Sequence, residues 1–167
     1  MEGREESRVR KNETRETTIK IRGDMTTENY VNFETAKLLK EKGFDGECMS
    51  MYLTPKPHSG MGNPNEAKIA PHGRDSHYYD GYLYQCEAPT IQMAVKWLRK
   101  MGFHIFVPLE IDYDEDERGD KWYHDATYYP EIRRVSDGKI MYDDGRLYAT
   151  PEQAYEVAIR YCLENLL

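Results

Sequence analysis

The sequence contains few cysteines, and they are widely spaced along the chain. Cys48, Cys86 and Cys162 form no CxxC pair, so neither a disulfide framework nor a zinc site is indicated. No apolar run approaches the roughly 20 residues of a membrane-spanning helix. Met1 is followed by charged residues instead of the apolar stretch of a secretory signal. We therefore expect a soluble, cytoplasmic protein with reduced cysteines and no membrane partner.

Hydrophobic side chains are also scarce, at 39% of the 167 residues, whereas charged residues make up 32%. The first 24 residues carry seven basic and six acidic side chains and few large apolar ones. We expect residues 1–24 to be a flexible mixed-charge arm and residues 25–167 to form one domain. That domain holds sixteen basic and twenty-four acidic residues, which disfavours nucleic acid as a partner. Nucleic-acid binding stays open only for the basic residues of the arm: Arg8, Arg10, Lys11 and Arg15.

Two segments in the first two thirds of the chain carry the start and stop patterns of helices. Asn32 can cap a helix over residues 33–42, and Gly43 ends it. A second helix is predicted over residues 90–101, where Gly102 is the stop. Glycine ends helices because it adopts the left-handed conformation without steric cost.

The last eighteen residues carry the strongest helix pattern of the chain. The Thr150 hydroxyl can accept a hydrogen bond from the backbone N–H of Gln153, and Pro151 suits the first helical position. Apolar residues then recur at steps of three and four: Ala154, Val157, Ala158 and Tyr161. One face of this helix must therefore pack against the rest of the domain.

Short extended segments separate the helices. Strands are predicted over residues 46–53, 82–86, 104–111 and 122–129, with tight turns at Asp137-Gly138 and Asp144-Gly145. Within residues 104–111, Ile105, Val107, Leu109 and Ile111 alternate on one face, and Pro108 indicates an edge strand or a bulge. The order of elements predicts an α+β fold, an antiparallel β-meander of about four to five strands flanked by three helices.

Five short segments resemble a known group of proteins. They are residues 32–37 (NFETAK), 42–44 (KGF), 88–90 (APT), 97–99 (WLR) and 155–159 (YEVAI). In this order they resemble small uncharacterised proteins found widely in gut Bacteroidota and their phages. The resemblance implies an intracellular bacterial or phage setting, often on a mobile element. No activity is established for that group, so none is carried over to this chain.

The loop over residues 55–81 is the first place where chemistry is expected. It is longer than most connections without secondary structure, and such loops are often functional. It contains His58, and His72, Asp75 and His77 have the side chains to bind zinc or another divalent ion. Neither histidine pair has the spacing of one helical turn, so a polar loop with scattered histidines is the simpler interpretation.

The acidic run over residues 110–120 partly follows the pattern of a calcium loop. Asp112, Asp114 and Asp116 stand at alternate positions, but Glu117 takes the place of the turn glycine. A hairpin connection exposed to solvent is the favoured interpretation. Its carboxylates also offer a partner a charge pattern similar to a nucleic-acid backbone.

Tyrosine is the most suggestive residue type, with fourteen tyrosines against four phenylalanines. Six of them form the predicted partner-binding set: Tyr78, Tyr79, Tyr82, Tyr84, Tyr123 and Tyr128. Tyrosine is favoured at protein interfaces because it joins an apolar ring to a polar tip. Half-burial in a thin sheet with one wet face explains the same pattern equally well.

No nucleophile stands beside a base in a recognisable catalytic motif, so no catalytic residue is predicted. The sequence favours a non-enzymatic binding protein that engages a protein partner, with no cofactor, as an accessory factor of a phage or mobile element. The alternative is a metal-dependent hydrolase that uses His72, Asp75 and His77. Whether the chain forms homo-oligomers is left open.

Overall fold

The computed structural model describes residues 29–60, 62–73 and 79–167 of the chain. Within these ranges the fold is α+β, as predicted, with three α-helices and eight strands that pair in antiparallel fashion. The elements are α1 (Phe33–Glu41), β1 (Ser50–Pro55), β2 (Lys68–Pro71), β3 (Tyr82–Glu87), α2 (Ile91–Lys100), β4 (Phe103–Phe106), β5 (Leu109–Glu115), β6 (Lys121–Tyr128), β7 (Glu131–Arg134), β8 (Ile140–Asp143) and α3 (Pro151–Tyr161). A π-helical turn, Cys162–Leu166, continues α3.

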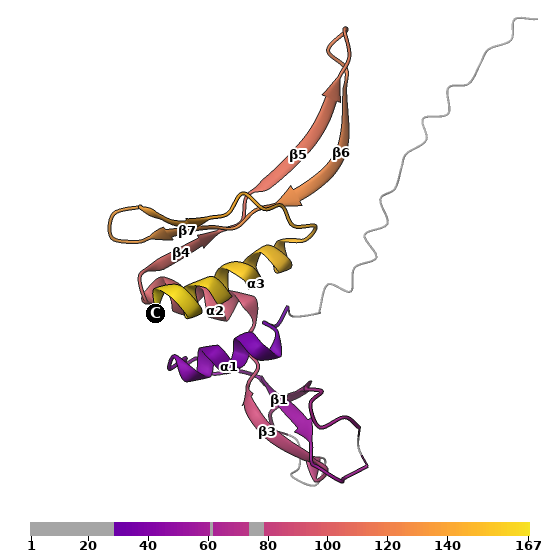
Figure 1. Cartoon of the computed structure of the whole chain (residues 1–167), viewed down its shortest axis with the longest axis vertical. Helices are drawn as coiled ribbons and strands as arrows, with labels where there is room; N and C mark the ends of the chain where they lie inside the picture. The colour runs from indigo at the N-terminus through magenta and orange to yellow at the C-terminus, as the bar shows by residue number, and fades with distance from the viewer. Residues whose placement is uncertain (1–28, 61, 74–78) are drawn as a thin grey trace, which may run out of the picture.

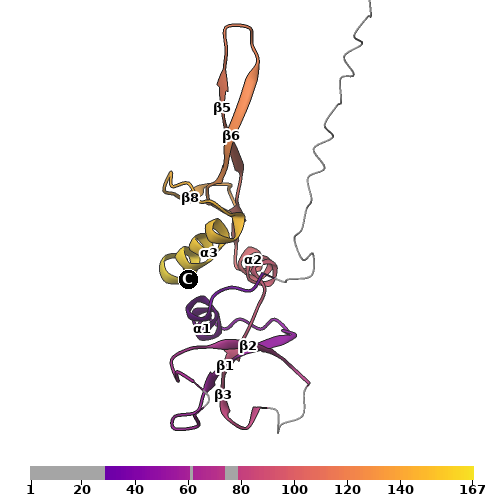
Figure 2. The same cartoon turned by 90° about the vertical axis from the view of Figure 1, so that its right-hand side faces the viewer.

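The strands outnumber those expected and form three small sheets. Their orders are β2-β1-β3, β4-β7-β8 and the hairpin β5-β6. The helices occupy the centre of an elongated molecule, with sheet β2-β1-β3 at one end (Figure 1). The β5–β6 hairpin projects at the other end, beyond sheet β4-β7-β8 (Figure 2). This arrangement leaves the hairpin with few neighbours.

The helices begin and end at their capping residues. Each N-cap side chain accepts a hydrogen bond from the backbone N–H three residues later: Asn32 from Thr35 at 2.9 Å, Thr90 from Met93 at 3.2 Å and Thr150 from Gln153 at 3.3 Å. Gly43 and Gly102 follow α1 and α2 with φ angles of +84° and +98°, a region that glycine enters freely. The predicted positions of α1 and α2 and the predicted start of α3 are confirmed.

The strand predicted over residues 104–111 is wrong as a single element. The chain leaves β4 after Phe106 and enters β5 at Leu109, because Pro108 has no N–H to donate to a ladder. The two halves have different surroundings. Ile105 is buried in the core, whereas Ile111 is exposed on the hairpin.

The loop expected over residues 55–81 also contains a strand. β2 pairs with β1, and the register places Tyr52 opposite Ile69. A strand of four residues is too short to show a clear alternation of apolar and polar side chains. Because the sequence around β2 is also polar, the strand was not predicted.

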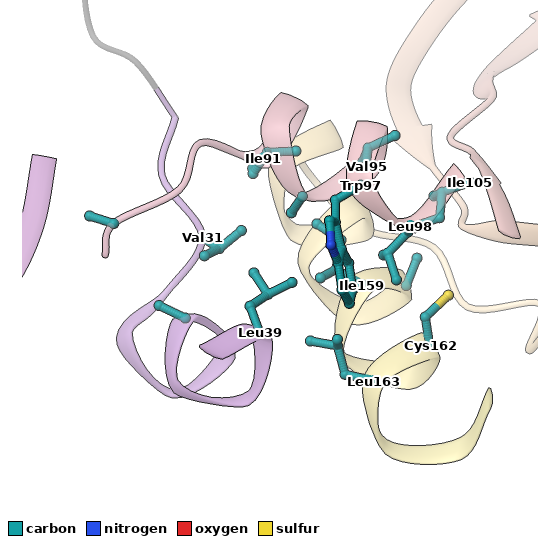
Figure 3. Packing of buried hydrophobic residues seen from close by; sticks show 14 of the residues in the cluster. Val31, Leu39, Ile91, Val95, Trp97, Leu98, Ile105, Ile159, Cys162 and Leu163 are labelled. Atoms are coloured by element: carbon teal, nitrogen blue, oxygen red, sulfur yellow. The ribbon is translucent and has the colours of Figure 1, made fainter. Parts of the chain in front are cut away.

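The core lies between the three helices and the strands that face them. Leu39, Leu98 and Ile159, one from each helix, are fully buried and lie close together (Figure 3). Ile132 of β7 joins this cluster, also fully buried. The ring of Trp97 meets the ring of Phe44 edge to face, with centroids 5.9 Å apart. This core fixes α3, which carries one wall of the groove described below.

Candidate functional site

The β5–β6 hairpin is an arm with an ordered turn. Asp116 closes the turn, because its Oδ1 accepts hydrogen bonds from the backbone N–H groups of Arg118 and Asp120, both at 2.9 Å. Gly119 has a φ of +82° in this turn. The acidic run over residues 110–120 thus forms strand β5 and a hairpin turn, which is the interpretation that the sequence favoured over a calcium loop.

One face of the hairpin is apolar. The register pairs Leu109 with Tyr128, Ile111 with Ala126, and Tyr113 with Tyr123, and such cross-strand partners point to the same side. We call these six side chains the apolar face. Four of them are exposed over about half of their surface or more: Tyr123 (68%), Leu109 (50%), Tyr113 (49%) and Ile111 (46%).

Modest surface contacts hold the outer half of the hairpin together. The rings of Tyr113 and Tyr123 have centroids 6.1 Å apart, and Lys121 Nζ lies 4.2 Å from the centroid of the Tyr113 ring. On the opposite face, His124 Nε2 lies 2.8 Å from Asp114 Oδ2. Exposed contacts of these kinds contribute about 0.2–1 kcal/mol each. Every residue of β5 is exposed, and Leu109, Ile111 and Tyr113 keep about half of their surface accessible, so the core contributes little to this arm.

A groove of about 1180 Å³ lies beside the N-terminal half of α3. Its walls come from residues 29–32, Tyr52 of β1, Ile69 of β2, Ile91 at the start of α2, Tyr148 and the first two turns of α3. Tyr52 and Ile69 are register partners, so one face of sheet β2-β1-β3 forms a side of the groove. We call this feature the α3 groove.

Hydrogen bonds hold residues 29–32 against this groove. Asn29 Nδ2 donates to Glu152 Oε1 at 2.9 Å, which joins the segment to the first turn of α3. The Tyr52 hydroxyl donates to the backbone carbonyl of Val31. Burial is the main cause that raises the pKa of Tyr52 to about 12, so this hydroxyl stays protonated and keeps its donor. The segment is thereby a fixed wall of the groove.

Glu156, in the second turn of α3, contributes a largely buried carboxylate to the groove. Its Oε2 accepts a hydrogen bond of 3.2 Å from the backbone N–H of Asn32. Its Oε1 is buried and has no hydrogen-bond partner in the described part of the chain. Burial is the largest influence on the pKa of Glu156 and raises it, while Thr35, Asn32 and Arg160 reduce the rise. Thr35 acts on this pKa through its side-chain hydroxyl, which is itself buried and, like Oε1, has no hydrogen bond of normal geometry in the described part of the chain.

The structure divides the predicted partner-binding tyrosines between two regions. Tyr82 and Tyr84 lie in β3, and Tyr79 lies just before it, at the end of the molecule opposite the hairpin (Figure 1). Tyr123 and Tyr128 lie in β6 and belong to the apolar face. Tyr78 lies outside the described residues. These tyrosines therefore do not share one sheet face.

The tyrosines of β3 interact with neighbouring charges. Lys68 Nζ lies 3.4 Å from the ring centroid of Tyr82, and the Tyr84 hydroxyl donates to Glu87 Oε1 at 3.1 Å. Such contacts occupy the ring face of Tyr82 and the polar tip of Tyr84. Tyr123 of the hairpin, at 68%, is more exposed than Tyr84 of β3, at 51%, and it lies on an apolar surface.

Of the three predicted metal ligands, only His72 lies within the described residues. Its Nε2 is 2.7 Å from Glu87 Oε2, so a carboxylate of β3 already engages the ring. Asp75 and His77 lie outside the described ranges. Inside those ranges, no three His, Cys, Asp or Glu side chains are grouped as a metal site requires. The structure therefore supplies no geometry for the hydrolase alternative.

Sequence reasoning missed the apolar face and the α3 groove. The alternation of Leu109 and Ile111 was visible, but it placed them on one face of a single strand together with Ile105. A hairpin turn at Asp116 to Asp120, with apolar residues alternating on both sides, was the signal that could have identified the face. No local sequence pattern predicts the α3 groove, because its walls come from separate parts of the chain.

Comparison with known proteins identifies no relative. No protein-family model, no curated protein and no solved structure matches this chain. The resemblance to small proteins of gut Bacteroidota and their phages thus stays a prediction. Among the helices that the structure describes, none combines the length and the apolar character needed to cross a membrane.

Proposed function

We propose that this protein is a non-enzymatic binding protein that engages a protein partner through the apolar face of the β5–β6 hairpin. One observation carries the proposal. A two-stranded arm projects from the body and exposes Leu109, Ile111, Tyr113 and Tyr123 on one side. Contiguous apolar surface on a projecting element is a feature of interaction sites.

The energetics of the arm support this function. An isolated two-stranded hairpin is only marginally stable in water, and each square ångström of apolar surface removed from water stabilises by about 25 cal/mol. A partner that covers the apolar face would therefore gain binding energy and stabilise the arm at the same time. Tyr113 and Tyr123 suit such an interface, because tyrosine buries a large ring at a small cost in side-chain entropy.

The charge of the arm indicates the chemistry of the partner. Residues 109–128 contain eight carboxylates against two basic side chains, Arg118 and Lys121. Glu110, Asp112 and Asp114 alternate with the apolar residues of β5 and therefore point to the opposite face, so they do not interrupt the apolar face. Four more carboxylates lie at the outer end of the arm: Glu115, Asp116, Glu117 and Asp120. A surface with an apolar centre and a basic rim is complementary to this arm, and the opposite charges would speed association at low salt.

A photo-crosslinking experiment tests the proposal. The full chain carries benzoylphenylalanine in place of Tyr123 and is irradiated in an extract of the cells that produce it. We expect one dominant covalent adduct, identified by mass spectrometry. Adding Ile111→Asp should abolish the adduct, because it places a charge at the centre of the apolar face.

The matched control carries the crosslinker in place of Leu83, an exposed apolar residue of β3 at the other end of the molecule. We expect no dominant adduct from that position. Equal labelling from both positions, or an adduct that survives Ile111→Asp, would show that the apolar face is not the interface. An adduct between two copies of the chain would assign the face to self-association.

A further inference from the structure

The α3 groove combines apolar walls with negative charge and is separate from the apolar face. Its carboxylates are Glu152 and Glu156, on successive turns of α3. Among the described residues that line the groove, none carries a positive charge. Arg160, one turn further along α3, donates instead to Glu164, with Nε 2.7 Å from Oε1. The charge of the groove is therefore not neutralised by its own lining.

Glu156 gives the groove a specific recognition point. A buried carboxylate oxygen without a hydrogen-bond partner costs free energy, since water no longer solvates it. Oε2 accepts a hydrogen bond from the backbone N–H of Asn32, and Oε1 is buried without a hydrogen bond of normal geometry, although the Thr35 side chain helps to stabilise the carboxylate. A positively charged group in the groove would be attracted to this carboxylate and could form an ion pair with it.

The size and walls of the groove favour an extended chain over a small molecule. Its volume of about 1180 Å³ exceeds the roughly 300–1,000 Å³ of sites for small ligands. Ile69 is partly exposed on one side of the groove, and Tyr148 and Val157 line it elsewhere. Ile69 belongs to β2, which pairs on one side only among the described strands. Edge strands accept extended peptides, whose alternate side chains then fill neighbouring pockets.

We propose that the α3 groove binds an extended peptide segment of a partner protein in which Lys or Arg stands between apolar residues. The cation pairs with Glu156, and the flanking apolar side chains pack against Ile69 and Val157. Glu152 lies one turn away and favours a second basic residue in the same segment. The groove thus selects for a basic and apolar strand and against an acidic one.

Fluorescence anisotropy with a defined probe tests this site. The probe is a fluorescein-labelled peptide of alternating valine and lysine, Val-Lys-Val-Lys-Val, titrated with the full chain. We expect saturable binding that weakens roughly tenfold with Glu156→Gln, as for the loss of one charge-assisted hydrogen bond. Ile69→Lys should weaken binding at least as much, because it adds a positive charge beside the bound cation.

The matched control is Glu41→Gln, which removes one negative charge at the exposed end of α1. It should leave the affinity unchanged, and a peptide with glutamate in place of lysine should not bind. The absence of saturable binding, equal affinity for the glutamate peptide, or equal losses with Glu41→Gln and Glu156→Gln would each overturn the proposal. Hairpin variants such as Ile111→Asp should leave peptide binding intact, which separates this test from that of the apolar face.

Two other occupants of the groove are distinguished by the same assay. If residues 1–24 of the same chain fill it, replacing Lys20 and Arg22 by serine would increase the affinity for the probe. If a second copy fills it, the probe would convert a dimer to monomers in sedimentation velocity. Either result would overturn the assignment to a partner protein.

Discussion

Tyr128 and Tyr148 exchange two backbone hydrogen bonds, 2.9 Å from Tyr128 N to Tyr148 O and 2.8 Å in the reverse direction. This bridge joins the base of the hairpin to the segment that precedes α3. Tyr148 also lines the α3 groove, and Thr150 caps α3 two residues later. The two proposed binding surfaces therefore share one structural support while facing different parts of the molecule.

The core should depend strongly on Leu98, which is fully buried in α2. Leu98→Ala removes apolar contacts and leaves a cavity, so we expect the free energy of unfolding to fall by about 2–5 kcal/mol. Urea denaturation followed by circular dichroism measures this change. Val135→Ala is the control, because Val135 is exposed and its truncation should change stability by no more than about 0.5 kcal/mol. Similar effects of the two changes would contradict the packing described here.

The N-cap of α2 should contribute measurably to stability. Thr90→Ala removes the acceptor for the Met93 N–H, and we expect a loss of about 1 kcal/mol in the free energy of unfolding. Thr90→Ser keeps an acceptor oxygen and should retain most of this contribution. Urea denaturation of the unmodified chain and of the two variants measures these differences in stability. Equal stability of the alanine and serine variants would show that the cap hydrogen bond is not the cause.

Ionisation of Glu156 should reduce stability as pH rises. Burial raises its pKa above the ordinary value of 4.5, so the folded state favours the protonated carboxyl. The protonated Glu156 carboxyl therefore makes its full contribution to stability below pH 4.5. This contribution is lost as the pH rises through the pKa that Glu156 has in the folded state. We expect Glu156→Gln to be more stable than the unmodified chain at pH 7 and about equal to it at pH 4.

Urea denaturation at both pH values measures this effect, with Glu41→Gln as a control for the loss of an exposed charge. A destabilising effect of Glu156→Gln at pH 7 that is absent at pH 4 would contradict the sign. It would show that attractive contacts of the carboxylate outweigh its burial.

The cysteine thiols should resist modification in the folded protein. Cys86 and Cys162 have no exposed surface, and burial raises the pKa of Cys86 to about 11 and of Cys162 to about 12. Cys48 is half-buried, and burial with the nearby Glu87 carboxylate raises its pKa to about 11. Since the thiolate is the reactive form, all three should react slowly at pH 8.

Titration with a chromogenic disulfide reagent checks this expectation. In the native state Cys48 should react first, and Cys48→Ser should remove that early phase. Unfolding in urea should release the other two thiols together. Rapid native modification of Cys162 would contradict its place in the core.

The helices could be predicted because their determinants are local. Asn32, Thr90 and Thr150 each bond to an N–H three residues away, and Gly43 and Gly102 reverse the chain at the helix ends. Capping energies of about 1 kcal/mol act over a few residues of sequence. The hairpin turn at Asp116 belongs to the same class, because its closing hydrogen bonds join residues that are close in the chain.

Whether Leu109 and Ile111 are buried or exposed could not be predicted from the nearby sequence. Their alternation with Ile105 predicts one face of one strand, and that pattern is the same whether the face meets a core or solvent. Only the break at Pro108 and the direction of β5 away from the helices decided that Ile105 is buried and Ile111 exposed. Periodicity reports which residues share a side, and tertiary packing decides what that side faces.

The sequence by itself determined the α+β class, the three helices and the acidic hairpin turn, because these follow from hydrogen bonds and alternation over short stretches of chain. Only the tertiary structure decided which surfaces are open to a partner. The α3 groove exists because Asn29, Tyr52, Ile91 and Glu156 meet in space. Contacts between residues so far apart in the chain depend on how the whole core packs, and no local pattern encodes them.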